Sequence, residues 1–371
     1  MIARLRDQLL IPVLAILMGL VVGAVLMIAT SPLIDGHVQL DLPVKAYGAL
    51  IDGSMGSFNA IVQTLVEATP LVLAGLAVGL GFKAGLFNIG AQGQFLMGAL
   101  AAAVVGGWLA HESAWLAIPL AVLAGVLAGT LYGFIPGALK AFTGAHEVVT
   151  TIMLNYIALY VLAYLITGPL RDPLATFART VDVVNAGLPV IIGDRNGHLG
   201  LLIAALSVPV VWWLLFRSTL GFQIRAVGAN PDAARYAGMR PRALIVLTMS
   251  LSGLLAGLAG AIQILGLTKY MPIGYSSTIG FDAIAVALLG RSHPVGILLA
   301  ALLFGAMRAG AGLMQVRAGI PVQMIDVLQG VILFFLAADV ILRWLFRIRA
   351  RGVGLAQETT VTRSYGGQTS I

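Results

Sequence analysis

The sequence contains no cysteine, and charged residues make up only 10% of its 371 residues. Without cysteine the chain can form no disulfide, no thiolate metal site and no thiol nucleophile. No glycine is followed directly by lysine, which excludes the phosphate-binding loop of P-loop ATPases. The histidines are scattered without metal-ligand spacing, and no serine lies in a nucleophile motif. We therefore expect no catalytic residue, no metal site and no cofactor bound by this chain.

What the sequence has in excess is apolar surface. Hydrophobic residues make up 59% of the chain, the mean hydropathy is +0.98, and 45 residues are glycine. A soluble protein could not cover that much apolar surface, whereas a membrane protein uses its small residues to pack helices closely. The composition predicts an all-α polytopic membrane protein in contact with the lipid bilayer.

Apolar runs near the ~20 residues needed to cross a bilayer predict about ten transmembrane helices. They cover residues 9–29, 61–81, 95–110, 115–138, 148–167, 201–216, 244–265, 281–290, 295–314 and 322–346. The segments 30–60 and 168–200 are more polar and are expected to form loops on the outer side. We expect one transmembrane domain over residues 1–350 and a polar, disordered cytoplasmic tail over residues 351–371.

The net charge of +7 reflects topology, since most Lys and Arg residues fall on one side of this helix arrangement. Basic loops face the cytoplasm, which places both termini there. The positive charge therefore gives no support to nucleic-acid binding. Because five crossings separate helices 2–5 from helices 7–10, the two groups have opposite orientation, as in the inverted repeats of transporters.

One polar and basic stretch, residues 217–243, interrupts the apolar chain. Asn230 is a good N-cap, Pro231 suits the first helical position, and Asp232 suits the positive end of the helix dipole. Gly238 then ends the helix after barely two turns, and Pro241 prevents its resumption. The stretch predicts a short capped helix, which either docks on another protein or is a solvated loop helix.

Polar residues also gather at two places among the apolar runs. The segment 85–98, GLFNIGAQGQFLMG, joins two helices, and irregular backbone at membrane depth is tolerated where it lines protein or a watery cavity. The alternative is a cytoplasmic turn in which Asn88 caps the next helix. Asn155 and Tyr156 lie inside the fifth predicted helix, where they either contact a ligand or bond to neighbouring helices.

Two further features bear on packing. Glycines spaced four apart, such as Gly125 and Gly129 or Gly253 and Gly257, are interpreted as helix-packing contacts. Arg308 falls inside a predicted helix and should face protein or water near the outer edge, most simply in a structural ion pair.

Three motifs carry a family resemblance: GLFNIGAQGQFLMGA at 85–99, AHEVVTTIMLNYIA at 145–158 and RAVGANPDAARYAGM at 225–239. They resemble the permease subunits of bacterial ABC importers, in the branch that handles nucleosides, related to the ribose and branched-chain amino-acid permeases. Gln92 departs from the Glu that many members carry. Asp232-Ala233-Ala234 and Gly238 partly match the cytoplasmic loop signature of the wider importer family.

The resemblance implies a nucleoside importer, or one for a similar small neutral polar solute, in a bacterial inner membrane. ATP and Mg would be used by a separate ATPase, which would receive the coupling helix near 231–239. The coupling residues would be Asn230, Pro231, Asp232, Ala233, Ala234, Arg235, Tyr236, Ala237 and Gly238. A second permease chain, identical or related, and an extracytoplasmic solute-binding lipoprotein would complete the transporter.

A neutral solute needs neutral donors and acceptors in a mostly apolar cavity. The candidates to line the pathway are Asn88, Gln92, Gln94, Asn155 and Tyr156. Other interpretations remain: the same kind of importer for a simple sugar or a branched-chain amino acid, an ion-coupled secondary transporter, or a membrane-embedded enzyme. The secondary transporter would need an intramembrane acid, whereas Glu67, Asp282, Asp326 and Asp339 are placed towards the ends of their predicted helices.

Overall fold

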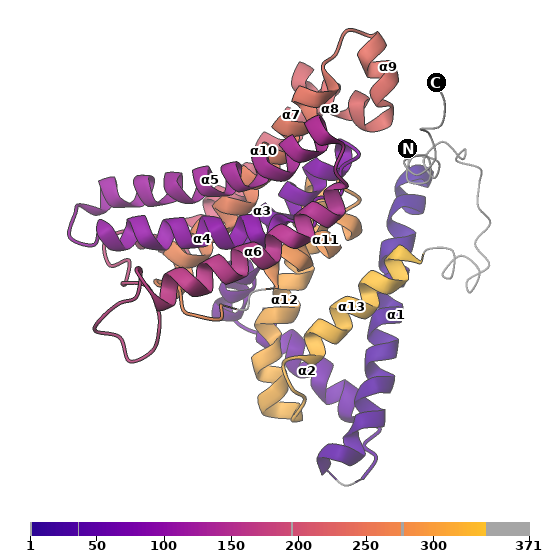
Figure 1. Cartoon of the computed structure of the whole chain (residues 1–371). Coiled ribbons are helices and arrows are strands. Elements are labelled where there is room, and N and C mark those ends of the chain that lie inside the picture. The colour runs from indigo at the N-terminus through magenta and orange to yellow at the C-terminus, as the bar shows by residue number, and fades with distance from the viewer. Residues whose placement is uncertain (1, 36, 194–195, 276–277, 339–371) are drawn as a thin grey trace.

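The computed structural model describes residues 2–35, 37–193, 196–275 and 278–338. These residues form a bundle of helices with one short two-stranded hairpin, which confirms the all-α prediction (Figure 1). The predicted tail at 351–371, the end of the tenth predicted helix and Asp339 lie outside the described residues.

The first half of the chain contributes six α-helices and one short π-helix. They are α1 (Ile2–Asp35), α2 (Leu42–Met55), α3 (Phe58–Lys83), α4 (Ala91–Trp108), α5 (Ala114–Ala138), η1 (Leu139–Thr143) and α6 (Glu147–Thr167).

The second half begins with the hairpin and continues with helices. Its elements are β1 (Val190–Ile192), β2 (Gly197–His198), α7 (Gly200–Arg217), α8 (Thr219–Ala229), α9 (Pro231–Tyr236), α10 (Pro241–Gln263), η2 (Ile264–Thr268), α11 (Ile279–Leu289), α12 (Pro294–Ala318) and α13 (Met324–Ala337).

Among the described residues, seven helical segments are long and apolar enough to cross a membrane: α1, α3, α5 with η1, α6, α7, α10 with η2, and α12. The chain is therefore a polytopic membrane protein. The remaining predicted spans correspond to α4 and to the shorter apolar helices α11 and α13. The count of ten membrane-spanning helices is not confirmed.

The segment predicted as an outer loop at 30–60 is largely helical. α1 continues to Asp35, and α2 follows with Leu42, Ala46 and Ala49 buried in a cluster that includes Met307 of α12. The loop prediction was wrong because polar residues break the apolar run, although the buried positions of α2 still recur at helical spacing.

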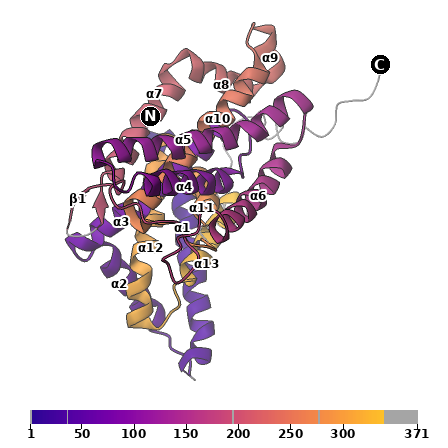
Figure 2. The ribbon, with the colours of Figure 1, turned by 60° about the vertical axis from the view of Figure 1, so that its left-hand side comes forward.

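The two groups of helices pack against each other reciprocally. The first helix of the earlier group, α3, packs on α11 and α12, and the first helix of the later group, α10, packs on α4 and α5. Figure 2 shows α4 and α5 running side by side. An exchange of this kind is what an inverted repeat would produce, and the repeat itself stays a prediction.

Glycines allow the closest of these contacts, between α5 and α10. A Cβ on Gly129 would collide with the backbone of Gly253 and Gly257, and a Cβ on Gly253 would collide with the backbone of Gly129. The glycine pairs singled out in the sequence therefore face each other across one interface. Membrane helices lack a hydrophobic drive to associate, so such backbone proximity supplies much of their packing.

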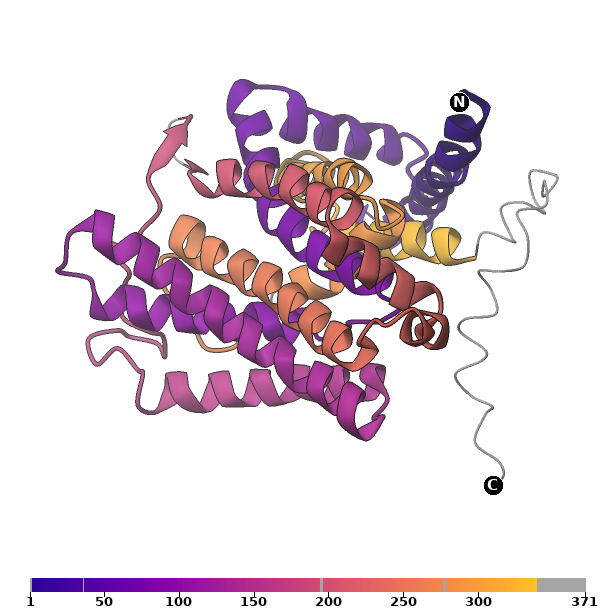
Figure 3. The same cartoon turned by 90° about the horizontal axis from the view of Figure 1, so that it is seen from above.

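The hairpin of β1 and β2 stands out from the bundle beside the start of α7 (Figure 3). His198 is buried there, and its Nδ1 accepts a hydrogen bond from the backbone N–H of Gly200 (3.1 Å). Burial, together with the charge of Lys269, lowers the pKa of His198 to about 4. The imidazole is therefore neutral near pH 7 and serves as a fixed structural acceptor.

The α5–α10 interface predicts that alanine substitution lowers the stability of the protein at a glycine inside the contact but not at a glycine outside it. Gly129→Ala should destabilise the protein by about 1–3 kcal/mol, because the added methyl group must displace backbone. Gly48→Ala is the matched control, since nothing lies within 4 Å of a Cβ at that position. Thermal unfolding in detergent would measure both, and equal melting temperatures for the two variants would show that the contact is not tight.

Candidate functional site

The motif at 85–98 forms an irregular joint between α3 and α4. α3 ends at Lys83, Gly85 adopts a left-handed φ of 70°, and α4 begins at Ala91. Asn88 is fully buried in this joint. Its Nδ2 donates to the Oε1 of Gln94 (3.0 Å) and to the Oγ of Ser252 on α10 (2.8 Å), and Ser252 in turn donates to the carbonyl of Ala77 (2.7 Å). A side-chain amide therefore fastens the joint to both α3 and α10.

Asn155 of α6 holds the same joint from the other side. Its Oδ1 accepts from the backbone N–H of Gly93 (2.8 Å), and its Nδ2 donates to the carbonyl of Ile89 (3.0 Å). A Cβ on Gly90 would lie 3.0 Å from the Cβ of Thr151, so α6 approaches the joint closely. The second motif thus packs on the first, and Asn155 supplies the hydrogen bonds that the irregular backbone lacks.

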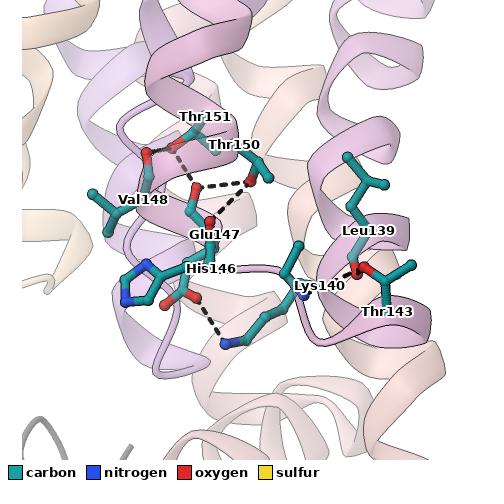
Figure 4. A network of polar contacts seen from close by, with 9 residues as sticks. Leu139, Lys140, Thr143, His146, Glu147, Val148, Thr150 and Thr151 are labelled. Carbon is teal, nitrogen blue, oxygen red and sulfur yellow. Dashed lines mark hydrogen bonds and ion pairs between the residues drawn. The ribbon is translucent and has the colours of Figure 1, made fainter. Parts of the chain in front are cut away.

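The start of α6 is fixed by a polar network (Figure 4). Glu147 forms an ion pair with Lys140 of η1 (2.8 Å), and its carbonyl accepts from the hydroxyls of Thr150 (3.0 Å) and Thr151 (2.7 Å). Thr143 donates to the carbonyl of Leu139 (2.6 Å). The network holds the turn between α5 and α6, and with it the position of Asn155.

Gln92 connects the joint to the second group of helices. Its Oε1 accepts from the backbone N–H of Gly280 (2.9 Å), in the first turn of α11. A neutral amide suffices for this bond, so no charge is needed at position 92 to make it.

The five pathway candidates are therefore not equivalent. Asn88, Gln92, Gln94 and Asn155 are buried around one joint and bond to protein, whereas the side chain of Tyr156 is turned outward and is 56% exposed. Asn88 bonds to other side chains and does not cap α4, whose N-cap is Gly90. A role of these residues in lining a pathway stays a prediction.

A cavity of about 600 Å³ lies on the other side of Gly280. Its polar lining residues are Glu67 of α3, Gln263 of α10, Tyr275 and Thr278 of the segment before α11, Arg308 of α12 and Asp326 of α13. Ile279 also lines it and directly precedes Gly280, to which Gln92 is bonded. The cavity volume is in the range of small-molecule sites.

Arg308 forms an ion pair in the wall of this cavity, as the sequence suggested. It pairs with Asp282 of α11, and its Nη2 also donates to the Oγ1 of Thr278 (2.8 Å), which donates to Asp282 Oδ2 (2.9 Å). Sequence reasoning missed the site itself, because it placed Glu67 and Asp326 at the ends of separate helices and did not predict that they lie near each other. Ionisable residues within apolar helices were the available signal.

The short capped helix appears as α9. Asn230 Oδ1 accepts from the backbone N–H groups of Asp232 and Ala233 (both 3.0 Å), and Gly238 ends the helix with a φ of 83°. α9 lies at the end of the bundle opposite to the loop between α6 and α7 (Figure 1). Tyr236 is 89% exposed at this end.

α9 is connected to the irregular joint through α8. Ala234 is the buried residue of α9, in a cluster with Ala84 and Leu86 from the start of the joint. A Cβ on Gly228 of α8 would lie 2.9 Å from the backbone N of Gly85 and 2.8 Å from the backbone C of Ala84. Two glycines thus bring α8 into backbone contact with the turn that leads to Asn88.

Residues 60–337 match a family model described as the permease component of the branched-chain amino acid transport system. The chain belongs to this permease family. The family resemblance inferred from the three motifs is therefore confirmed, and the interpretations as a secondary transporter or a membrane-embedded enzyme are dropped. A permease subunit of an ABC transporter is not itself an enzyme and implies an ATPase partner.

Individual relatives cover most of the chain. It is 38% identical to a guanosine ABC transporter permease of Bacillus subtilis (strain 168), over 95% of this chain and 99% of the relative. It is 35% identical to a nucleoside ABC transporter permease of Lactococcus lactis subsp. cremoris, over 90% and 92%. It is also 35% identical to a glucose ABC transporter permease of Haloferax volcanii, over 88% and 86%.

The contact between α8 and the joint predicts a transport defect. In Gly228→Ala the added methyl group would push the 83–85 turn away, at a cost of about 1–3 kcal/mol, and uptake by cells carrying the variant should fall about tenfold. Gly330→Ala is the control, since its Cβ would meet nothing within 4 Å. If Gly228→Ala takes up solute as fast as the parent at matched amounts of protein in the membrane, the contact between α8 and the joint is not needed for transport.

Proposed function

We propose that the chain is the membrane-spanning permease subunit of an ABC importer for nucleosides. The observation that carries the proposal is the near full-length similarity to permeases named for guanosine and for nucleosides. A relative named for glucose is almost as similar. These solutes share a neutral, polyhydroxylated sugar, which suits a cavity that combines hydrogen-bonding side chains with apolar walls.

In the proposed assembly, the ATPase binds to the exposed side of α9. The helix is exposed on every residue except Ala234, which anchors it to the permease. Closure of the ATPase on ATP and Mg would move α9, and the α8 contact would pass that movement to the joint that holds Asn88, Gln92 and Gln94. Rigid-body rocking of the helix groups would then open the pathway alternately to each side.

Topology and partners follow from this arrangement. We place both termini and α9 in the cytoplasm and the cavity in the outer half of a bacterial inner membrane. The basic α9 region and the start of α1 lie towards the same end of the bundle, in agreement with the positive-inside rule (Figure 1). A second permease chain would complete the pathway, and an extracytoplasmic solute-binding lipoprotein would deliver the solute to the outer face.

The direct test is uptake of radiolabelled guanosine and uridine by cells with and without the gene, with glucose and leucine as competitors. Deletion should abolish the saturable uptake, and only nucleosides should compete. If glucose competes as strongly as nucleosides do, the substrate class would instead be simple sugars. Competition by leucine alone would assign the chain to amino-acid transport.

Docking of the ATPase can be tested at Tyr236. Tyr236→Ala removes an exposed aromatic side chain without touching the core, so the permease should melt at an unchanged temperature. Loss of an aromatic anchor costs about 2 kcal/mol or more, and binding of the ATPase should weaken about thirtyfold. Trp108→Ala is the control, because Trp108 is also exposed (75%) but lies at the end of α4. Co-purification with the ATPase in detergent measures the loss; full retention would argue against docking at α9.

A further inference from the structure

The outer cavity contains a carboxylate with a free acceptor. Arg308 pairs with Asp282 and donates to Thr278, and no hydrogen bond joins it to Glu67 among the described residues. Within the described part of the chain, Glu67 forms no ion pair, and its side-chain partner is the neutral amide of Gln63. Glu67 therefore presents an acceptor to the cavity that it lines.

Neighbouring groups hold Glu67 in one orientation. Asn196, beside the hairpin, donates to the Oε1 of Gln63 (3.1 Å), and Gln63 donates to the Oε1 of Glu67 (3.0 Å). This chain of amides fixes Oε1 and leaves Oε2 without a hydrogen-bond partner among the described residues. Binding sites need side chains that supporting residues hold in place, and Glu67 meets this requirement.

The chemistry of the lining defines the ligand group. An unprotonated carboxyl oxygen accepts hydrogen bonds, so an occupant that bonds to it must supply donors. Hydroxyl groups of a ribose are such donors, and an acidic residue that accepts from a ribose 2′-hydroxyl is a recurring solution in nucleotide-binding folds. The second carboxylate, Asp326, lines the same cavity, while Ile279, Ala311 and Ile325 supply an apolar wall for a flat base.

We propose that Glu67 is a specificity-determining residue that accepts hydrogen bonds from the sugar hydroxyls of the transported nucleoside. This inference rests on the proposed function and adds a distinction between ribonucleosides and 2′-deoxyribonucleosides. The permease should prefer ribonucleosides to 2′-deoxyribonucleosides, because a site built to bond a hydroxyl is left with an unpaired buried acceptor when that hydroxyl is missing.

The experiment compares uptake of radiolabelled guanosine and 2′-deoxyguanosine by a deletion strain that carries the parent chain or a variant. The parent should favour guanosine by about tenfold or more. Glu67→Gln keeps the size and the contact with Gln63 but weakens the acceptor, and should bring the two solutes to within about threefold. Glu67→Asp, which withdraws the carboxylate by one methylene, should give an intermediate ratio and provides a second variant if Glu67→Gln folds poorly.

The ratio of the two solutes is an internal measure that does not depend on how much protein reaches the membrane. The solute-binding protein is the same in every strain, so any change in the ratio arises from this chain. The matched control is Asp52→Asn, a carboxyl-to-amide change in the exposed ion pair with Arg317, away from this cavity. It should leave the ratio unchanged, since an exposed ion pair contributes little.

The two proposals fail in different ways. If the parent takes up neither solute, the nucleoside assignment falls and the role of Glu67 falls with it. If the parent takes up both solutes equally, or if Glu67→Gln keeps the parental ratio, sugar recognition by Glu67 is overturned and the permease assignment stands.

Discussion

An interrupted helix inside an apolar bundle needs side chains to replace the hydrogen bonds that water would otherwise supply. In this protein, Asn155 satisfies that requirement for the joint between α3 and α4, because it bonds to the backbone of Gly93 and Ile89. Asn88 and Gln94 bond to each other inside the joint. Much of the remaining arrangement depends on the joint. Ser252 of α10 accepts a hydrogen bond from Asn88 of the joint, and Gln92 accepts one from the backbone of α11. The backbone of α8 lies in close contact with Gly85. A single irregular segment therefore contacts both helix groups and α8.

Backbone proximity gives the bundle its rigidity around this joint. Glycines of α5 and α10 meet without side chains between them, and the same device brings Gly228 of α8 against Gly85. Close-packed contacts of this kind leave little room for gradual deformation. Gln92 also connects the joint to the cavity, because it bonds to Gly280 and the preceding residue, Ile279, lines that cavity.

Much of the fold could be predicted from the sequence. Run length and charge gave the membrane class, and the capping residues at 230–238 gave α9 to within one or two residues of its bounds. The candidate site was predicted only in part. Asn88, Gln92, Gln94 and Asn155 were identified as unusual polar residues, but their partners Ser252, Gly280 and Gly93 lie on other helices or in backbone, and periodicity says nothing about such pairs.

The sequence by itself determined that the chain is a polytopic helical membrane protein, that α9 is a capped exposed helix and that the three motifs belong to one permease family. Hydrophobic length and capping chemistry are local properties of the chain, and the family rests on the resemblance of three short motifs. Only the tertiary structure decided that α2 is a packed helix and that the polar joint is internally satisfied. It also decided that Glu67, Asp326 and Arg308 line one cavity, with Arg308 paired to Asp282. These outcomes depend on which helix faces meet, and that is settled by packing between segments far apart in the chain.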